Sequence, residues 1–343
     1  MKKLNQLLSV VLLLTVCALA ATAKPLQAGL AKIAITPDRP VWLSGYASRN
    51  KPSEGKLHDI WAKALAVEDG QGQRFVLLSA EILGFSRAVA EAIAARAQQQ
   101  YGLQREQLML NATHTHSAPV IRENLIGAYD LDAEQSARIN EYAQQLQDKL
   151  IAVIGEALRD LSPAKISCTH GTGSFAKNRR QPSPSGMRIG VNDSGPVDHD
   201  VPVLIIEATD GKLRGLVFGY ACHNTTLTDK HYEISGDYAG FAQAALESAH
   251  PGVTAMFVMG CGADINPFPR TTIENAQQNG ASLAQVVEQA LRRKRLSVRG
   301  TIKLAFDRVL IPFATPPTRE EFQARLNDKD IYKQRHAQRM LQR

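Results

Sequence analysis

The stretch "WAKALAVEDGQGQRFVLLSA" (61–80) contains two runs rich in apolar residues, 61–68 and 74–80, separated by a short polar segment. Apolar residues are nearly continuous within each run, which is typical of strands that are covered on both faces. Strands of this kind occur in α/β proteins, where helices pack on the sheet. The stretch therefore indicates an α/β fold.

Strand and helix patterns alternate along the rest of the chain. Further strands are expected over 29–35, 108–112, 164–171, 201–208, 215–222, 254–260 and 300–311. Helices are expected near 86–101, 238–249 and 274–295, and the clearest one follows Asp132, which suits a capping box with Gln135. We therefore predict a single large α/β domain. It carries a long loop over 177–200, of a kind that is often functional, and a capped helix after the loop at 315–322.

The first residues, "MKKLNQLLSVVLLLTVCALAATAK" (1–24), have the pattern of a leader for export. Lys2 and Lys3 precede an apolar run, and Ala21-Thr22-Ala23 offers the small residues at which a signal peptidase cuts. We predict a signal peptide over 1–23 and a periplasmic or secreted mature domain over 24–343. A lipoprotein anchored at Cys17 is the less favoured alternative, because Val16 stands where a small residue is expected.

Composition and charge exclude some classes of protein. Forty-four per cent of the residues are hydrophobic, enough for a sizeable core, and no run beyond the leader is long enough to span a bilayer. The formal charge of +7 is modest, and its densest cluster, 292–295, lies at the end of an expected helix, where cations are favourable. We therefore expect no nucleic-acid partner. Cys168, Cys222 and Cys261 remain after the leader, either as buried thiols or as one disulfide and one thiol.

Two histidines follow the expected strand 108–112, in "NATHTHSAP" (111–119). Alternate residues of a strand share a face, so His114 and His116 would point the same way with backbones roughly 7 Å apart. They could bind one ion only if the chain bends. More naturally, one would bind a metal and the other act beside it as an acid or base. Polar histidines at a strand end are the alternative.

A third histidine, His223 in "YACHNTT" (220–226), also comes directly after a strand. Ligands of α/β sheets gather at the carboxyl ends of strands, so His223 becomes a reasonable partner for His114.

Two polar segments could line the same site. In "MGCGADINPFPR" (259–270), Asp264 follows Gly260 and Gly262; the segment is either a wall of the active site or a connection that needs positive φ. Asn178 and Arg179 begin the expected long loop, where an arginine could hold a carbonyl or carboxylate oxygen or could be solvated. Asp237 is expected to cap the helix 238–249, with orientation of His223 as the alternative.

The order of the motifs resembles a known family. The motifs are "AGLAKIAITP" (28–37), "LSGYASR" (43–49), "HDIWAKALAVEDG" (58–70), "THTHSAP" (113–119), "NRRQPS" (178–183), "YACHNTTL" (220–227), "ISGDYAGFA" (234–242) and "GADINP" (262–267). In this succession, from about Gly29 to Phe313, the chain resembles the catalytic domain of the neutral/alkaline, non-lysosomal ceramidases.

The resemblance implies a fold, a reaction and a site. The fold would be a layered sandwich of mixed β-sheets flanked by helices. The reaction would be hydrolysis of an N-acyl amide, ceramide giving sphingosine and a fatty acid, on a lipid-like substrate; contact with a membrane surface is left open. His114 and His223 would bind one zinc ion, His116 would be a catalytic neighbour, and Arg179, beside Asn178, would contact the reacting group. Zinc also fits the chemistry by itself, because it polarises a carbonyl and activates water at neutral pH.

Two departures from the family are visible. Asn266 stands where the family has a serine; it cannot be a nucleophile but can donate a hydrogen bond to an oxyanion. Metal-activated water is therefore the expected attacker, and another amide or ester is an alternative substrate. The family's remaining zinc ligands, a glutamate and a tyrosine, lie farther downstream, so we expect a domain that is incomplete at its carboxyl end. A degenerate, non-catalytic secreted domain is the third alternative.

Overall fold

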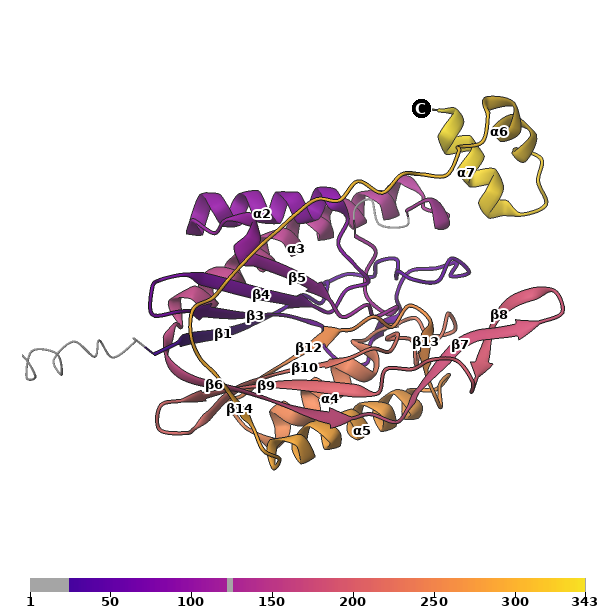
Figure 1. Cartoon of the computed structure of the whole chain (residues 1–343). Coiled ribbons are helices and arrows are strands. Elements are labelled where there is room, and N and C mark those ends of the chain that lie inside the picture. Colours follow the sequence, from indigo (N-terminus) through magenta and orange to yellow (C-terminus); the bar gives the residue numbers. More distant parts are fainter. Residues whose placement is uncertain (1–24, 122–125, 343) are drawn as a thin grey trace, which may run out of the picture.

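The structure of the protein is a computed structural model that describes residues 25–121 and 126–342. The expected leader over 1–23 lies outside the described residues. Four layers make up most of the molecule: a pair of helices, two half-sheets, and a second pair of helices (Figure 1). The predicted α/β sandwich of mixed sheets flanked by helices is therefore confirmed.

The first half-sheet contains the stretch that indicated the fold. Its strands are β1 (Gln27–Ala34), β3 (Trp61–Glu68), β4 (Arg74–Ala80) and β5 (Leu108–Ala112). The pairs β1–β3 and β3–β4 are antiparallel, and β4–β5 is parallel. Helices α2 (Arg87–Tyr101) and α3 (Ala133–Arg159) cover one face, as Figure 1 shows. Asp132 caps α3, because its side chain accepts a hydrogen bond from the Gln135 backbone amide at 2.6 Å. The Gln135 side-chain oxygen has no hydrogen-bond partner among the described residues. Only half of the expected capping box therefore forms.

The second half-sheet carries the other helix pair. Its strands are β6 (Ser162–Thr172), β9 (Asp200–Ala208), β10 (Leu213–Tyr220), β12 (Thr254–Met259) and the short β14 (Leu296–Val298). Only β10–β12 is parallel. Helices α4 (Asp237–Ala249) and α5 (Ile273–Leu291) pack on its outer face. Helix α5 ends before the basic cluster 292–295, four residues earlier than expected.

The half-sheets are joined and packed face to face. Strands β1 and β6 pair only at Gln27–Pro163 and Ala28–Ser162, which makes one continuous sheet that folds over at this corner. Successive residues of a strand point to opposite faces: Ala64 lies in the core under α2 and α3, and Leu65 lies between the half-sheets. Both faces of these strands are therefore buried, as their continuous apolar runs predicted.

Two sequence predictions about irregular segments are wrong. The segment 177–200, expected as a long loop, forms most of a hairpin of β7 (Ala176–Ser183) and β8 (Gly186–Asn192), and β13 (Ile265–Pro267) pairs with β7. Pro184 and Ser185 form the tight turn between the two strands, and Gly186, which begins β8, has a φ of 109°. The run 300–311, expected as a strand, pairs with no strand among the described residues, and its Ile302 amide donates to a side chain, Asp69 Oδ2, at 2.8 Å.

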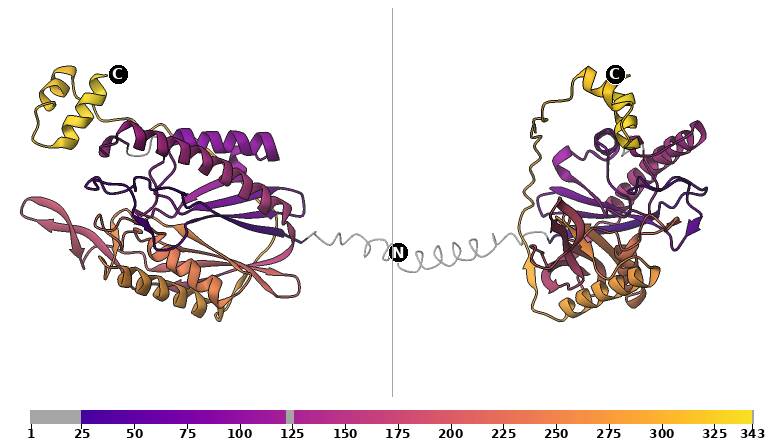
Figure 2. Two further views of the ribbon diagram at one scale, coloured as in Figure 1. Left: turned by 180° about the vertical axis from the view of Figure 1, so that it is seen from behind. Right: turned by 90° about the vertical axis from the view of Figure 1, so that its right-hand side faces the viewer.

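The last described residues form two short helices beyond the four layers. Figure 2 shows the unpaired segment after β14 running across the layers to α6 (Arg319–Arg325) and α7 (Ile331–Leu341). Helix α6 is the capped helix expected after the loop, and Thr318 and Glu321 form a capping box at its start. The remaining short elements are β2 (Gly55–Lys56), β11 (Glu233–Ile234), η1 (Arg105–Gln107) and η2 (Ile126–Ala128). In the described part of the chain, no helix combines the length and the apolar character needed to cross a bilayer.

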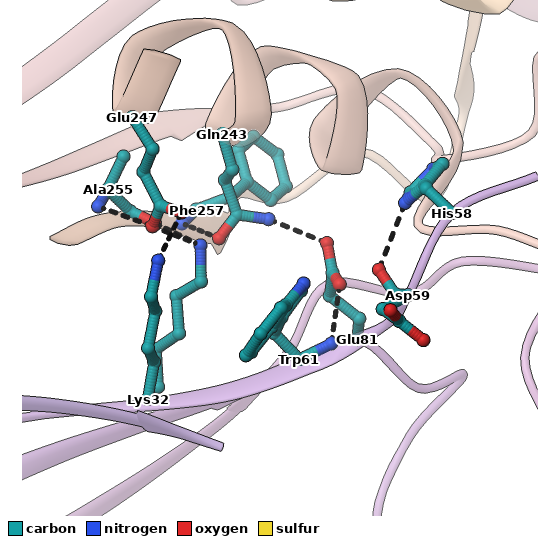
Figure 3. A network of polar contacts seen from close by, with 10 residues as sticks. Lys32, His58, Asp59, Trp61, Glu81, Gln243, Glu247, Ala255 and Phe257 are labelled. Atoms are coloured by element: carbon teal, nitrogen blue, oxygen red, sulfur yellow. Dashed lines mark hydrogen bonds and ion pairs between the residues drawn. The ribbon is translucent and has the colours of Figure 1, made fainter. Parts of the chain in front are cut away.

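Side chains, rather than another strand, cover the free edge of β12. The amides of Ala255 and Phe257 donate to Glu247 and Gln243 of α4, at 3.1 and 3.3 Å. The Ala255 carbonyl accepts from the ammonium of Lys63, which is 2% exposed and also pairs with Glu247 at 2.7 Å. Figure 3 shows how Glu247 also meets Lys32, and how Glu81 accepts from Gln243 and the Trp61 amide. We call this group, Lys32, Lys63, Glu81, Gln243 and Glu247, the polar seam.

The three cysteines of the described chain are free thiols. Cys222 is buried, Cys168 is half-buried and Cys261 is exposed. The alternative with one disulfide is therefore wrong.

Candidate metal centre

His114, His116 and His223 converge at the carboxyl ends of β5 and β10. Strand β5 belongs to the first half-sheet and β10 to the second, so the site lies where the two meet. One ring nitrogen of each histidine lies within 4.8 Å of the others. The His114 Nε2 atom is 3.0 Å from His223 Nε2 and 3.5 Å from His116 Nε2. All three predicted histidines are thus brought together.

A bend in the backbone lets the two histidines of "THTH" meet. His114 has φ of 63°, in the left-handed region that residues other than glycine rarely adopt. The spacing argument for an extended strand therefore does not hold at this position. Strained conformations of this kind concentrate at functional sites.

The outer nitrogens of two histidines fix their tautomers. His114 Nδ1 lies 2.6 Å from the Leu83 carbonyl, and His223 Nδ1 lies 2.9 Å from the Gly262 carbonyl. A carbonyl only accepts, so each Nδ1 carries the proton and each Nε2 carries a lone pair. Two lone pairs therefore face each other at 3.0 Å with nothing to share.

A cation would resolve this arrangement. Two imidazole nitrogens on one tetrahedral zinc ion, each at about 2.0–2.1 Å, lie roughly 3.4 Å apart. Backbone carbonyls on the far nitrogens are also what orients histidine ligands in metal sites. The donor set of His114 and His223 therefore fits zinc.

His116 is held differently. Its Nδ1 atom is buried and has no hydrogen-bond partner among the described residues, and its Nε2 atom has only the long 3.5 Å contact with His114 Nε2. Gly45 packs closely against the His116 ring, since a Cβ at Gly45 would lie 2.4 Å from the imidazole. The centroids of the Tyr46 and His116 rings are 4.9 Å apart. The packing holds the ring in place and leaves its proton free to move.

Burial keeps all three imidazoles neutral. Burial, opposed by the hydrogen bond to the Gly262 carbonyl and reinforced by the Arg179 guanidinium, lowers the pKa of His223 to about 4. Burial, followed by the other two histidines, holds the pKa of His116 well below its ordinary value, and burial also lowers the pKa of His114. Neutral imidazole is the form that binds a metal or accepts a proton.

Arg179 and Asn266 lie together beside the histidines. Arg179 Nη1 donates to Asn266 Oδ1 at 3.1 Å, and Nη2 donates to the Ala263 carbonyl at 2.6 Å. Thr225 also donates to Asn266 Oδ1, at 3.3 Å. The Asn266 carbonyl is thus turned toward Arg179 and its amide group toward the other side.

Asn178 and Asp264 support this pair. Asn178 is 2% exposed and donates to Asp264 Oδ2 at 3.2 Å and to the Pro196 carbonyl at 3.0 Å. The Arg179 amide donates to the Asp264 carbonyl at 2.7 Å. Both side chains hold the β7–β13 corner in shape. Contact of Asn178 or Asp264 with a substrate remains a prediction.

Two supporting residues differ from the sequence predictions: Arg49 was not singled out, and Asp237 has another role than expected. Arg49 is 3% exposed and donates to the backbone carbonyls of His116 and His231, at 2.6 and 3.0 Å. None of its hydrogen bonds to the described residues goes to a carboxylate. Arg49 ends the motif 43–49, and that position was the only signal for it. Asp237 accepts from the Thr226 and Leu227 amides, at 3.1 and 2.8 Å, and so holds the loop after His223. Its expected role as helix cap is wrong, because Gly236 occupies the cap and Asp237 begins α4.

Comparisons with known proteins agree with this geometry. Residues 27–290 match the family described as neutral/alkaline non-lysosomal ceramidase, N-terminal. The neutral ceramidase of Pseudomonas aeruginosa is 27% identical over 277 residues, covering 76% of this chain and 40% of that protein. The neutral ceramidase of Mycobacterium tuberculosis is 24% identical over 206 residues, covering 58% and 32%.

A solved structure shows the same fold. The crystal structure of neutral ceramidase from P. aeruginosa superposes with a TM-score of 0.68 at 23% identity, covering 81% of this chain and 46% of that one. The chain therefore spans less than half the length of these relatives.

Proposed function

Because the chain belongs to the neutral/alkaline non-lysosomal ceramidase family, we propose that it hydrolyses the N-acyl bond of ceramide or of a similar lipid amide, with zinc as its metal. The curated relatives quoted above are named neutral ceramidases. The reaction would give a fatty acid and a sphingosine-like amine.

The facing lone pairs of His114 and His223 carry this proposal. Their Nε2 atoms lie 3.0 Å apart, and both tautomers are set by backbone carbonyls. Such a pair is unfavourable without a cation and favourable with one. When bound there, zinc would polarise the amide carbonyl and lower the pKa of an attacking water.

Arg179 and Asn266 would stabilise the oxyanion that forms on the carbonyl. Arg179 Nε is buried without a partner, and Asn266 Nδ2 has no acceptor among the described residues. Two donors held in advance are what an oxyanion site requires, because they need no reorganisation as charge develops.

His116 would move the proton. Its imidazole is neutral at pH 7, it lies beside His114, and its Nδ1 is not committed to an acceptor. It can therefore take a proton from the attacking water and deliver it to the leaving amine.

Asn266 favours a second candidate, the hydrolysis of a different amide or ester. The carbonyl of Asn266 is fixed by Arg179 and Thr225, so the residue offers a donor where the family has a hydroxyl. A parallel assay on ceramide, simpler N-acyl amines and acyl esters separates the two candidates, since they predict a different best substrate.

The test combines metal content and hydrolysis. Purified wild type is expected to hold one zinc ion per chain and to hydrolyse an N-acyl substrate, and His114→Ala is expected to lose both. His250→Ala is the matched control, because His250 lies away from the site and pairs with Glu288. Zinc binding and turnover that survive in His114→Ala would refute the proposal.

We also propose that the protein is exported, on the pattern of residues 1–24 alone. N-terminal sequencing of the protein recovered from the periplasm or medium should begin at Lys24. A lipid-modified chain that begins at Cys17 would support the lipoprotein alternative instead.

A further inference from the structure

The hairpin of β7 and β8 reaches beyond the two half-sheets, as Figure 1 shows. Its base belongs to the candidate site, because Arg179 of β7 donates there to Asn266. Its outer part, residues 180–191, carries several exposed apolar side chains. What these side chains meet decides how the candidate site is oriented toward its surroundings.

One face of the hairpin is apolar. Met187, Ile189 and Val191 alternate along β8 and are 70%, 58% and 37% exposed. Their neighbours on β7 are Pro182, opposite Met187, and Arg180, opposite Ile189. Residues that pair directly across two strands share a face, so these five exposed side chains form one surface. We call this surface the hairpin face.

The opposite face of the hairpin is polar and closed. Gln181 lies opposite Arg188, and its Oε1 atom accepts from Arg188 Nε at 3.0 Å. The same oxygen covers Gly190, where a Cβ would lie 2.1 Å from it. The polar groups of this face therefore bind each other, while the apolar side chains of the hairpin face remain exposed.

The charge of the hairpin is positive throughout. Residues 177–192 contain one lysine and three arginines and no acidic residue. Lys177 pairs with Asp193 at 2.9 Å, and Arg179 is turned into the candidate site. Arg180 and Arg188 remain as exposed cations near the apolar side chains. These surroundings suit an anionic partner.

A lipid bilayer with anionic headgroups fits this combination. Apolar side chains on one face can enter the boundary between headgroups and acyl chains, while arginines keep their guanidinium groups at the level of the phosphates. A stable protein interface takes roughly 20–30 residues from each partner, and the hairpin face offers five. Fluid lipid requires no matching surface, so a small projecting face is enough.

We propose that the hairpin face docks on an anionic lipid bilayer and so directs the candidate site toward the membrane surface. Met187, Ile189 and Val191 enter the lipid, and Arg180 and Arg188 contact the phosphates. The use of this contact in turnover rests on the proposed function, since a lipid amide would lie in that surface. The contact itself can be tested without turnover.

Sedimentation with vesicles tests the contact. The zinc-loaded protein is the exported form that begins at Lys24, so that the expected leader plays no part. Vesicles of phosphatidylcholine with about 30% phosphatidylglycerol, free of any N-acyl lipid, are the probe. Met187→Glu combined with Ile189→Glu should weaken binding at least tenfold, because two apolar side chains are replaced by anions. Wild type that does not sediment with these vesicles overturns the proposal.

The matched control removes exposed apolar side chains elsewhere. Val309→Glu combined with Leu310→Glu changes two residues of the unpaired segment after β14, which are 79% and 95% exposed. This variant should bind the same vesicles as tightly as wild type does. A loss in the control that equals or exceeds the loss in the hairpin variant overturns the proposal.

The arginines give an independent test. Arg180→Gln and Arg188→Gln should each weaken binding to the anionic vesicles by about fivefold, and neither should change binding to phosphatidylcholine alone. Lys165→Gln, at an exposed position near the start of β6, is the control and should keep the affinity of wild type. An equal loss in Lys165→Gln would mean that only net charge matters, which overturns the role of the hairpin.

Insertion into the lipid can be measured directly with Met187→Trp. The added fluorescence should shift to shorter wavelength on the anionic vesicles and should be quenched by lipids that are brominated in their acyl chains. Gln144→Trp, at an exposed position of α3, is the control and should not be quenched. Both spectra are corrected for the two natural tryptophans with the wild-type protein. A Met187→Trp signal that the brominated lipids do not quench overturns the proposal.

The two proposals fail differently. If vesicles are bound through the hairpin face but no N-acyl substrate is hydrolysed, the proposed function fails and the membrane contact stands. If an N-acyl lipid in vesicles is hydrolysed by the hairpin variant at the rate of wild type, the contact fails and the function stands. A dimer that dissociates in Ile189→Glu, in a protein that binds no vesicles, assigns the hairpin face to a second copy and overturns the proposal.

Discussion

Two buried polar clusters of this protein are built in opposite ways. In the polar seam, Lys63 pairs with Glu247 at 2.7 Å, and Glu81 accepts from Gln243 and the Trp61 amide at 2.8 and 2.7 Å (Figure 3). In the metal centre, two lone pairs face each other and His116 Nδ1 has no partner among the described residues. The seam is satisfied by the protein alone and the metal centre is not.

The difference separates a structural cluster from a functional one. Buried polar groups without partners cost free energy, so a folded protein keeps them only where something else compensates. The seam needs nothing from outside, and it stabilises the contact between the halves of the molecule. The histidines lack such partners, and their ring nitrogens are placed as in a group that could hold a metal ion.

Breaking the seam should have the largest effect on stability. Lys63→Met leaves the Ala255 carbonyl unpaired and takes from Glu247 one of its two cations. The free energy of unfolding should fall by about 3–5 kcal/mol, as expected when one partner of a buried pair is lost. Urea unfolding measures it. Lys177→Met, which removes an exposed pair with Asp193, is the control and should cost less than about 1 kcal/mol. Similar losses in the two variants would contradict the structural role of the seam.

Zinc should stabilise the metal centre and leave the seam unaffected. At a free zinc concentration 100 times its Kd, the free energy of unfolding should rise by about 2.7 kcal/mol. The rise should be the same in wild type and in Lys63→Met. His223→Ala should show no such gain. A thermal melt with and without zinc decides the matter, and an equal gain in His223→Ala would show that zinc binds elsewhere.

Arg179→Lys should lower turnover by about 10- to 100-fold. The lysine keeps the charge but loses the fork that meets Asn266 and Ala263. Zinc affinity should not change, because Arg179 binds no metal in this arrangement. The neighbouring Arg180 is exposed, and Arg180→Lys should keep turnover within twofold. A loss that appears in KM rather than kcat would argue against a role in the transition state.

The metal-free protein should lose a smaller amount of stability in mild acid. The pKa of His223 is about 4 in the folded chain and about 6.5 when unfolded, so the unfolded chain binds more protons between these values. Stability should therefore fall as pH drops from 6.5, by about 1 kcal/mol at pH 5.5 for His223 alone. Urea unfolding at both pH values measures this, and His223→Gln should reduce the slope. If the change of the free energy of unfolding with pH is the same in His223→Gln as in wild type, groups other than His223 cause it.

Local pattern predicted most of the elements. The ends of β3, β4 and β5 agree with the sequence prediction because their apolar runs stop at polar or turn residues such as Asp69. The segment 300–311 has a strand pattern too, but a strand also needs a neighbour, and the local sequence does not reveal that the described part of the chain provides none.

The three histidines that lie together were predictable from the sequence, and their geometry was not. His114, His116 and His223 were found because they follow strands, and Arg179 and Asn266 because they stand in an ordered set of motifs. The left-handed backbone at His114 depends on contacts far away in sequence, such as the one to Leu83. Arg49 acts through backbone carbonyls, which carry no side-chain signature.

The covered edge of β12 has a consequence for how copies of the protein meet in solution. An open edge strand invites another chain to pair with it, which is a common start of aggregation. At Ala255, Phe257 and Met259 the outward amides already donate to Glu247, Gln243 and Asn111. A strand from another molecule would have to displace three side chains, two of them from a packed helix. Strand β12, which precedes the turn with the Gly262 carbonyl that contacts His223, is thereby closed to intermolecular pairing, with or without metal.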